Sequence, residues 1–198
     1  MIKQSKSRFL ILLLSAILLC AQSANALPVG DKTLYESLGV PFSLGKGFAQ
    51  VDCEVYQYTT GSYAGKYVYA YQISNLNAGI GISFFSVEIL EGATAESASY
   101  DQIVGTVDPI YWTIISSPPQ IQSVEALFAN TLDNGETSAR LWFASNYAPS
   151  LGSGALFGRA SLGMEEVVTP IPEPSTLILL GSLVGLANFK RKKMLCLK

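Results

Sequence analysis

The chain has 198 residues, 49% of them hydrophobic, and a formal net charge of −2. It contains no histidine, which excludes Ser-His-Asp and Cys-His nucleophiles, histidine general bases and histidine metal ligands. The charges are segregated along the chain. All fifteen acidic residues lie between residues 31 and 173, where only five basic residues are found. This segment therefore carries a net charge of −10, which disfavours nucleic acid and anionic lipid as partners.

Residues 1–26 have the organisation of a secretory signal peptide. Three basic residues precede an apolar run over 9–19, and Ala24 and Ala26 form an A-x-A cleavage site. An uncleaved membrane anchor is the alternative, which these small residues disfavour. We expect removal of 1–26 and export of the chain from Leu27 onward.

Residues 27–168 are expected to form one exported β domain. Residues 27–47 are a weakly patterned lead-in in which 33–38 could form one helical turn, and 91–102 are small and polar, which indicates a loop. Alternating or apolar runs predict strands at 51–58, 67–73, 80–90, 110–115, 121–129, 138–144 and near 155–162. About seven short strands without a long helix indicate an all-β fold, an antiparallel sandwich.

Cysteine and tyrosine positions suggest how this domain is packed. Cys53 is its one cysteine, so no internal disulfide forms, and its place on the apolar side of a strand indicates the core. The alternating tyrosines at 67, 69 and 71 share one strand face, where core packing is favoured over a platform for sugar rings. Tyr56 and Tyr58 lie on the acidic side of the preceding strand and are the candidates for glycan contact.

Two acidic features of the sequence could serve as sites of chemistry. Asp52 and Glu54 project from one strand face, and a retaining glycosidase needs two carboxyl groups about 5 Å apart. Asp133-Asn134 could contribute to a calcium loop but lacks the spaced oxygen ligands of one. We favour a solvated face of the sandwich for Asp52 and Glu54, and a turn for Asp133-Asn134. We expect no catalytic residue, no cofactor and no metal.

The last thirty residues organise the chain. Prolines at 170, 172 and 174 form a stiff extended strut, followed by the uncharged apolar run 176–189 and a basic cluster at Lys190, Arg191, Lys192 and Lys193. Fourteen helical residues span about 21 Å against about 30 Å of hydrocarbon, and lysine stems can reach the interface. A buried core helix is the alternative. We expect a single C-terminal transmembrane helix with the basic cluster as a cytoplasmic stop.

The order Pro172-Glu173-Pro174-Ser175, apolar helix and basic cluster resembles the PEP-CTERM sorting signal of exopolysaccharide-producing bacteria. The resemblance implies that 169–193 is a sorting signal in which exosortase, an integral-membrane cysteine peptidase, recognises Pro172, Glu173 and Pro174. Family tails usually stop within the basic cluster, whereas this chain continues with 194–198, a short cytoplasmic extension.

The segments 67–75 and 133–143 also resemble exported domains found ahead of PEP-CTERM tails, which implies an immunoglobulin-like β-sandwich without a known activity. We therefore expect a non-catalytic cell-envelope or matrix protein, sorted by exosortase and associated with exopolysaccharide or biofilm. Its domain would first be anchored outside the inner membrane and then reach the cell surface or matrix. A carbohydrate-binding module using surface tyrosines is the alternative, and a glycan-active enzyme is a distant third.

Overall fold

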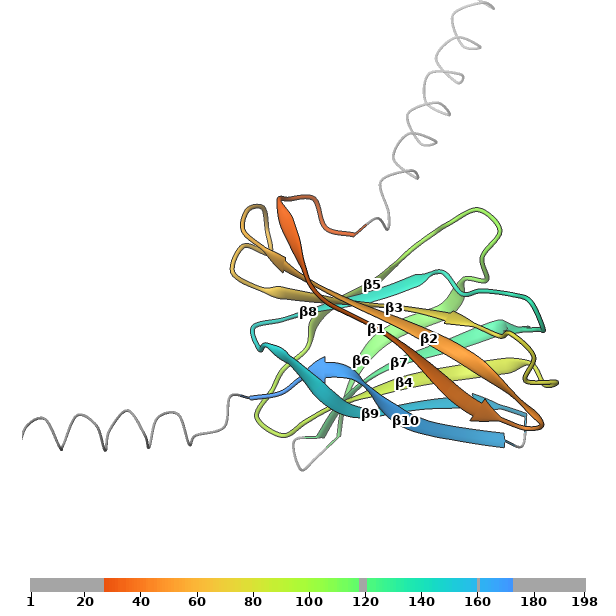
Figure 1. The fold of residues 1–198 in the computed structure, drawn as a ribbon. Coiled ribbons are helices and arrows are strands. Elements are labelled where there is room, and N and C mark those ends of the chain that lie inside the picture. Colours follow the sequence, from red (N-terminus) through yellow and green to blue (C-terminus); the bar gives the residue numbers. More distant parts are fainter. Residues whose placement is uncertain (1–26, 118–120, 160, 173–198) are drawn as a thin grey trace, which may run out of the picture.

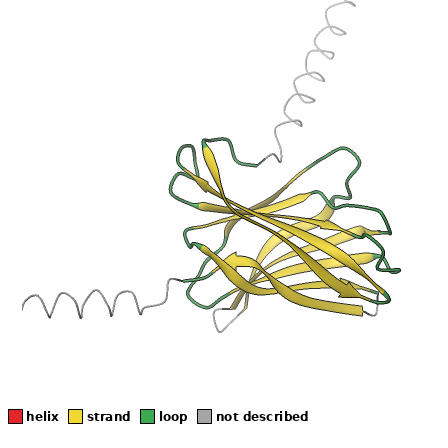
Figure 2. Ribbon diagram, in the orientation of Figure 1, coloured by secondary structure: helices red, strands yellow, loops and turns green. Residues whose placement is uncertain are grey.

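The computed structural model describes residues 27–117, 121–159 and 161–172, and in this part of the chain every regular element is a strand (Figure 2). There are ten: β1 (Lys32–Leu44), β2 (Gly47–Tyr58), β3 (Tyr67–Ser74), β4 (Ile82–Ile89), β5 (Glu96–Asp101), β6 (Pro109–Ser117), β7 (Ile121–Leu132), β8 (Arg140–Ser145), β9 (Pro149–Gly158) and β10 (Ser161–Pro170). The all-β prediction is confirmed. No helix among these residues is long and apolar enough to cross a membrane.

The strands form two five-stranded sheets that lie face to face (Figure 1). Sheet A has the order β1-β2-β3-β8-β5 and sheet B the order β10-β9-β4-β7-β6. All pairs of named strands are antiparallel, as predicted. Hairpins join β1 to β2, β2 to β3, β6 to β7 and β9 to β10, whereas the other connections cross between the sheets.

An aromatic cluster fills the space between the sheets. The ring centres of Tyr71 in β3 and Phe85 in β4 are 5.6 Å apart, and the Phe85 ring stacks on that of Trp112 in β6 with 6.2 Å between ring centres. The Trp112 indole N–H donates to the Trp142 carbonyl of β8 at 2.7 Å, which joins the sheets through a hydrogen bond.

Cys53, Tyr69 and Tyr71 are buried in this core, and Tyr67 packs against it. The predicted core packing of the cysteine and of the alternating tyrosines is confirmed.

Three parts of the sequence-based strand assignment are wrong. The lead-in forms β1 rather than a helical turn, the loop at 91–102 contains β5, and the last expected strand straddles the turn between β9 and β10. β1 contains Pro41, which an edge strand tolerates because one side of its backbone has no ladder partner. The final strand also continues to Pro170, two residues beyond the expected end of the domain at 168.

Glycines in β9 and β10 look like turn signals but serve close packing. A Cβ atom at Gly154 would lie 2.7 Å from a Val167 methyl group and 3.4 Å from the Phe42 ring. A Cβ atom at Gly163 would lie 2.8 Å from the Leu44 side chain and from a β1 carbonyl. The contacts of 2.7 and 2.8 Å are closer than a Cβ atom allows, so Gly154 permits β9 to lie beside Val167 of β10 and Gly163 permits β1 to lie against β10.

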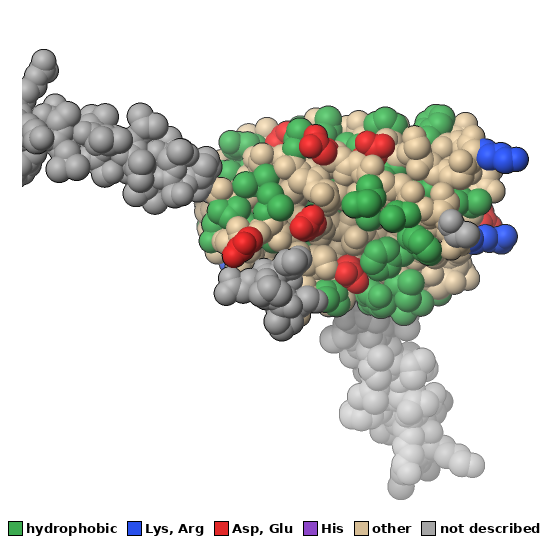
Figure 3. Space-filling model, turned by 90° about the horizontal axis from the view of Figure 1, so that it is seen from below, with side chains coloured by type: hydrophobic (Ala, Val, Ile, Leu, Met, Phe, Trp, Pro, Cys, Tyr) green, Lys and Arg blue, Asp and Glu red, His purple; other side chains and the backbone are tan. Residues whose placement is uncertain are grey.

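The outer face of sheet B is seen in Figure 3, where hydrophobic and acidic side chains are interspersed. The exposed apolar side chains of its last two strands are Leu151, Phe157, Leu162 and Met164. Apolar atoms make up much of any protein surface, so this face alone indicates no partner.

Candidate functional site

The end of β10 is fixed to both sheets. Its register with β9 is unbroken from the pair Ser161–Gly158 to the pair Pro170–Pro149. The buried Tyr71 hydroxyl of β3 donates to the Val168 carbonyl at 2.6 Å, and the Thr169 hydroxyl donates to the Glu88 carbonyl of β4 at 2.8 Å. The end of the last strand is therefore hydrogen-bonded to β9, β4 and β3.

The chain continues along the domain surface for two further described residues. The Ile171 N–H donates to the Ala148 carbonyl at 3.3 Å. Pro172 packs so closely on Gly92 that a Cβ atom there would lie 3.1 Å from the proline ring. Pro172 also borders a hollow of about 470 Å³, whose other lining residues are Gln57, Gly65, Tyr67, Asn146, Tyr147 and Ala148. The first residue of Pro-Glu-Pro is thus part of the domain surface.

Comparison with protein families identifies this stretch. A family model for the PEP-CTERM protein-sorting motif matches residues 170–192. The chain carries a PEP-CTERM sorting motif. This match confirms the resemblance seen in the sequence, and it indicates an exported protein that is first held at the membrane and processed by exosortase. No curated protein and no solved structure matches the chain.

The PEP-CTERM motif begins inside β10, because its first matched residue is the proline that pairs with Pro149. Of the predicted recognition residues, Pro172 is described, whereas Glu173 and Pro174 lie outside the described residues. The basic cluster, the transmembrane helix and the cleavage residues Ala24 and Ala26 also lie outside them and stay predictions.

A second candidate site lies on the outer face of sheet A. A hollow of about 180 Å³ is lined by Ser37, Asp52, Glu54, Ala70, Tyr71, Gln72 and Arg140. Its two carboxylates are already engaged: Asp52 accepts from the Gln50 amide at 2.6 Å, and Glu54 accepts from the Tyr56 hydroxyl at 2.8 Å. The Arg140 guanidinium lies 3.8 Å from Glu54. Each carboxylate thus has a side-chain partner, and the arrangement can bind a small polar group.

The expected exposure of Tyr58 is wrong. Tyr58 does lie on the outer side of its strand, but it is 1% exposed and its hydroxyl donates to the Pro28 carbonyl at 2.8 Å. Burial raises its pKa to about 12. Tyr56 is half-buried, with the Lys32 ammonium 5.0 Å from its ring centre. Glycan contact by Tyr56 stays a prediction.

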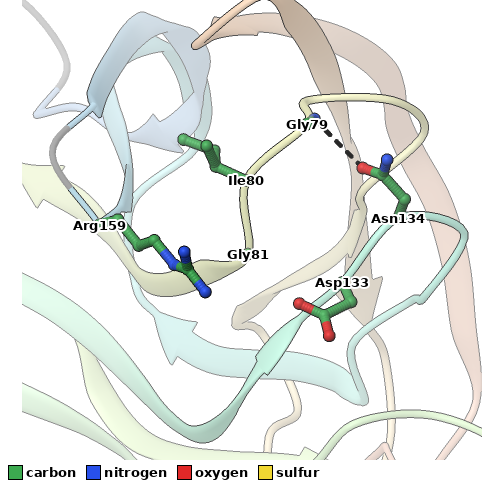
Figure 4. Close-up of a pocket in the computed structure, with 6 residues that line it drawn as sticks. All are labelled: Gly79, Ile80, Gly81, Asp133, Asn134 and Arg159. Atoms are coloured by element: carbon green, nitrogen blue, oxygen red, sulfur yellow. Dashed lines mark hydrogen bonds between the residues drawn. The ribbon is translucent and has the colours of Figure 1, made fainter.

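The Asp133-Asn134 turn borders a third hollow, of about 310 Å³ (Figure 4). The Asn134 side chain accepts from the Gly79 N–H at 3.2 Å, and the Arg159 side chain extends into the hollow from the opposite side. In the described part of the chain, no three acidic or cysteine side chains are grouped to hold a metal ion. The turn thus has a structural partner in the 79–81 loop.

The sequence did not single out Gln72 or Arg140, or a half-buried aspartate on β5, Asp101. These residues lie on β3, β8 and β5, which are neighbours in sheet A although the chain places other strands between them. No local pattern marks them, because only the strand order brings them together.

Proposed function

We propose that the chain is an exported, non-catalytic, immunoglobulin-like envelope or matrix protein that exosortase processes and that associates with exopolysaccharide. The observation that carries the proposal is the PEP-CTERM match at 170–192, directly continuous with the last strand of a folded domain. The folded domain thus lies immediately before the sorting motif, as expected for the exported part of a sorted protein.

A non-catalytic role draws support from the chemistry of the polar side chains. The chain lacks histidine, and the best-placed carboxylates, Asp52 and Glu54, bind neighbouring side chains. The net charge of −10 over residues 27–173 suits a soluble surface that neither nucleic acid nor anionic lipid would bind.

Pro-Glu-Pro offers a peptidase an extended segment whose ordering entropy is already lost, together with one negative charge. Replacing Glu173 by Ala should therefore block processing while export continues. Immunoblots of fractionated cells of an exosortase-containing host should then show the tailed chain accumulating in the inner membrane, as in the same host without exosortase.

Pro170→Ala is the matched control. It removes a proline of the matched stretch that belongs to β10 and lies outside Pro-Glu-Pro, so this variant should mature normally. Maturation of Glu173→Ala at the normal rate would show that the motif is only a linker before a plain anchor.

A carbohydrate-binding module is the second candidate, and the polar hollow beside Tyr56 is the observation that favours it. In co-sedimentation with exopolysaccharide from the host, Tyr56→Ala should reduce binding severalfold. The control Tyr111→Ala removes an exposed ring from sheet B and should leave binding unchanged. Equal binding by both variants and the unmodified chain would rule out this use of Tyr56.

A further inference from the structure

Residues 27–31 are fastened to the outer face of sheet A. The Pro28 carbonyl accepts from the Tyr58 hydroxyl at 2.8 Å, and the Asp31 N–H donates to the Thr60 hydroxyl at 2.8 Å. Leu27 packs against a small apolar cluster formed by Tyr58, Val68, Ala70, Trp142 and Ala144. The chain is therefore held in place from the residue that directly follows the predicted cleavage point.

The backbone nitrogen of Leu27 lies beside a carboxyl group. Its N–H lies near the carboxylate of Asp101, a half-buried side chain at the end of β5, and helps to lower the pKa of that carboxyl. The Oδ1 atom of Asp101 is buried and has no hydrogen-bond partner among the described residues. The same holds for the nearby indole N–H of Trp142, which nevertheless helps lower the pKa of this carboxyl. One acceptor and one donor, both buried, are therefore left without a hydrogen bond to the described residues at this site.

The cations around Asp101 compensate its burial only in part. Arg140 of β8 and Lys32 of β1 lower the pKa of Asp101, yet burial outweighs them and the pKa is raised. Arg140 also pairs with Glu54, and the Lys32 ammonium lies over the ring of Tyr58, which comes from β2. Tyr58 stays neutral in the physiological range, because its pKa is about 12. A further positive charge beside Asp101 would therefore be stabilising.

We propose that Asp101 is the binding site for the α-ammonium group that signal removal creates on Leu27. In the uncleaved chain this nitrogen is an amide with one hydrogen and no charge. Hydrolysis of the Ala26–Leu27 bond gives the hydroxyl of water to the Ala26 carbonyl carbon and a hydrogen to the Leu27 nitrogen. The resulting amine takes a proton from solvent at neutral pH. It then carries three donors and a positive charge beside a half-buried carboxylate, one oxygen atom of which has no hydrogen bond to any described residue.

The inference rests on the export that the proposed function includes, and it adds a consequence for folding. A free α-amino group has a pKa of about 7.7–8.0 in an unfolded chain, and a paired carboxylate raises this value in the folded chain. The stabilisation is therefore complete below about pH 7.7 and is lost as the pH rises through the folded value. A chain that retains its signal peptide lacks the pair and is less stable at neutral pH.

A direct test compares one molecule before and after cleavage. Residues 27–198, the expected mature chain, are purified in detergent behind a removable leader whose protease leaves Leu27 as the first residue. Cutting should lower the equilibrium constant for unfolding in urea about tenfold or more at pH 7, for a pKa shift of one unit or more. The gain should vanish near pH 10. Amine-reactive reagents should label Leu27 more slowly in the folded than in the unfolded chain.

Two variants control for other effects of cutting. Asp101→Asn keeps the side-chain shape and removes the charge, and one alanine inserted before Leu27 moves the ammonium group by about 3.3 Å along the chain. Both changes should abolish the gain in stability on cutting. Ionisation of Cys53 and the tyrosines at alkaline pH affects the cut and uncut forms alike. An equal gain in stability on cutting in all three chains, or no gain in the unmodified chain, would overturn the proposed pairing of Asp101 with the Leu27 ammonium group. Separately, the mass of the chain exported from the full gene reports whether the signal peptide is removed after Ala26, which tests export alone.

Discussion

The Tyr71 hydroxyl provides a sharp test of how the last strand is held. Tyr71→Phe removes one oxygen atom, keeps the ring, and deletes the 2.6 Å hydrogen bond from β3 to the Val168 carbonyl of β10. Both side chains are buried, Tyr71 at 1% and Val168 at 0% exposure, so water does not replace the donor. The Cys53 sulfur accepts from the Val168 N–H, so this contact does not provide the Val168 carbonyl with a second donor.

The expected cost follows from this geometry. A lost hydrogen bond costs about 1 kcal/mol, and a buried carbonyl left under-satisfied raises the total to about 2 kcal/mol. For a domain near 150 residues, each kcal/mol shifts the melting temperature by about 2–4 °C. Tyr71→Phe should thus lower the free energy of unfolding by about 2 kcal/mol and the melting temperature by about 4–8 °C.

Urea unfolding of the exported chain, followed by tryptophan fluorescence, measures the change, and near-UV circular dichroism gives the melting temperature. The matched control is Tyr111→Phe on β6, whose ring is 38% exposed. The control should change stability by less than about 0.5 kcal/mol, as exposed positions usually do. An equal effect of both substitutions would show that the bond between the sheets does not help to hold β10.

Two further predictions concern the core. Burial raises the pKa of Cys53 from 9.0 to about 12, so its stabilising effect is complete below pH 9 and is lost above it, by about 1.4 kcal/mol per pH unit. Urea titrations at pH 8, 9 and 10 should show a steeper loss for the unmodified chain than for Cys53→Ala, and parallel curves would contradict the burial of the thiol. Gly154→Ala forces a methyl group against Val167 and should destabilise the domain by about 1–3 kcal/mol in the same titration at pH 7. A methyl group in the control Gly39→Ala would lie 3.2 Å from the terminal atoms of two polar side chains, and a similar loss there would argue against close packing as the cause.

The sequence predicted those strands that alternate in polarity or are apolar along most of their length. The alternation at 51–58 and the apolar runs at 67–73 and 80–90 correspond to β2, β3 and β4 within a few residues. β1 was missed because its first half is exposed at a sheet edge and its second half contains Pro41. β9 and β10 were misplaced because their glycines, which permit contact with β1, have the composition of turns.

Tyr58 shows why faces are easier to predict than burial. Alternation placed it correctly on the outer side of β2. Its burial comes from Leu27 and Pro28, about thirty residues earlier in the chain, and from the ring of Tyr63 in the following turn. The Asp101 site is a similar case, because its residues meet only through the strand order of sheet A. The sorting motif, in contrast, is a contiguous pattern and could be recognised from sequence alone.

The continuity of β10 with the sorting motif also has a mechanical consequence. Tension on the tail enters the domain at Pro170, the end of a strand hydrogen-bonded to β9 throughout its ten residues. A pull along the strand axis loads these bonds in shear, so they share the force at the same time instead of breaking one after another. The side-chain bonds at Val168 and Thr169 connect the same strand to β3 and β4. Resistance to forced unfolding depends on the unfolding rate, and this arrangement slows that step where an anchored tail would pull on the fold.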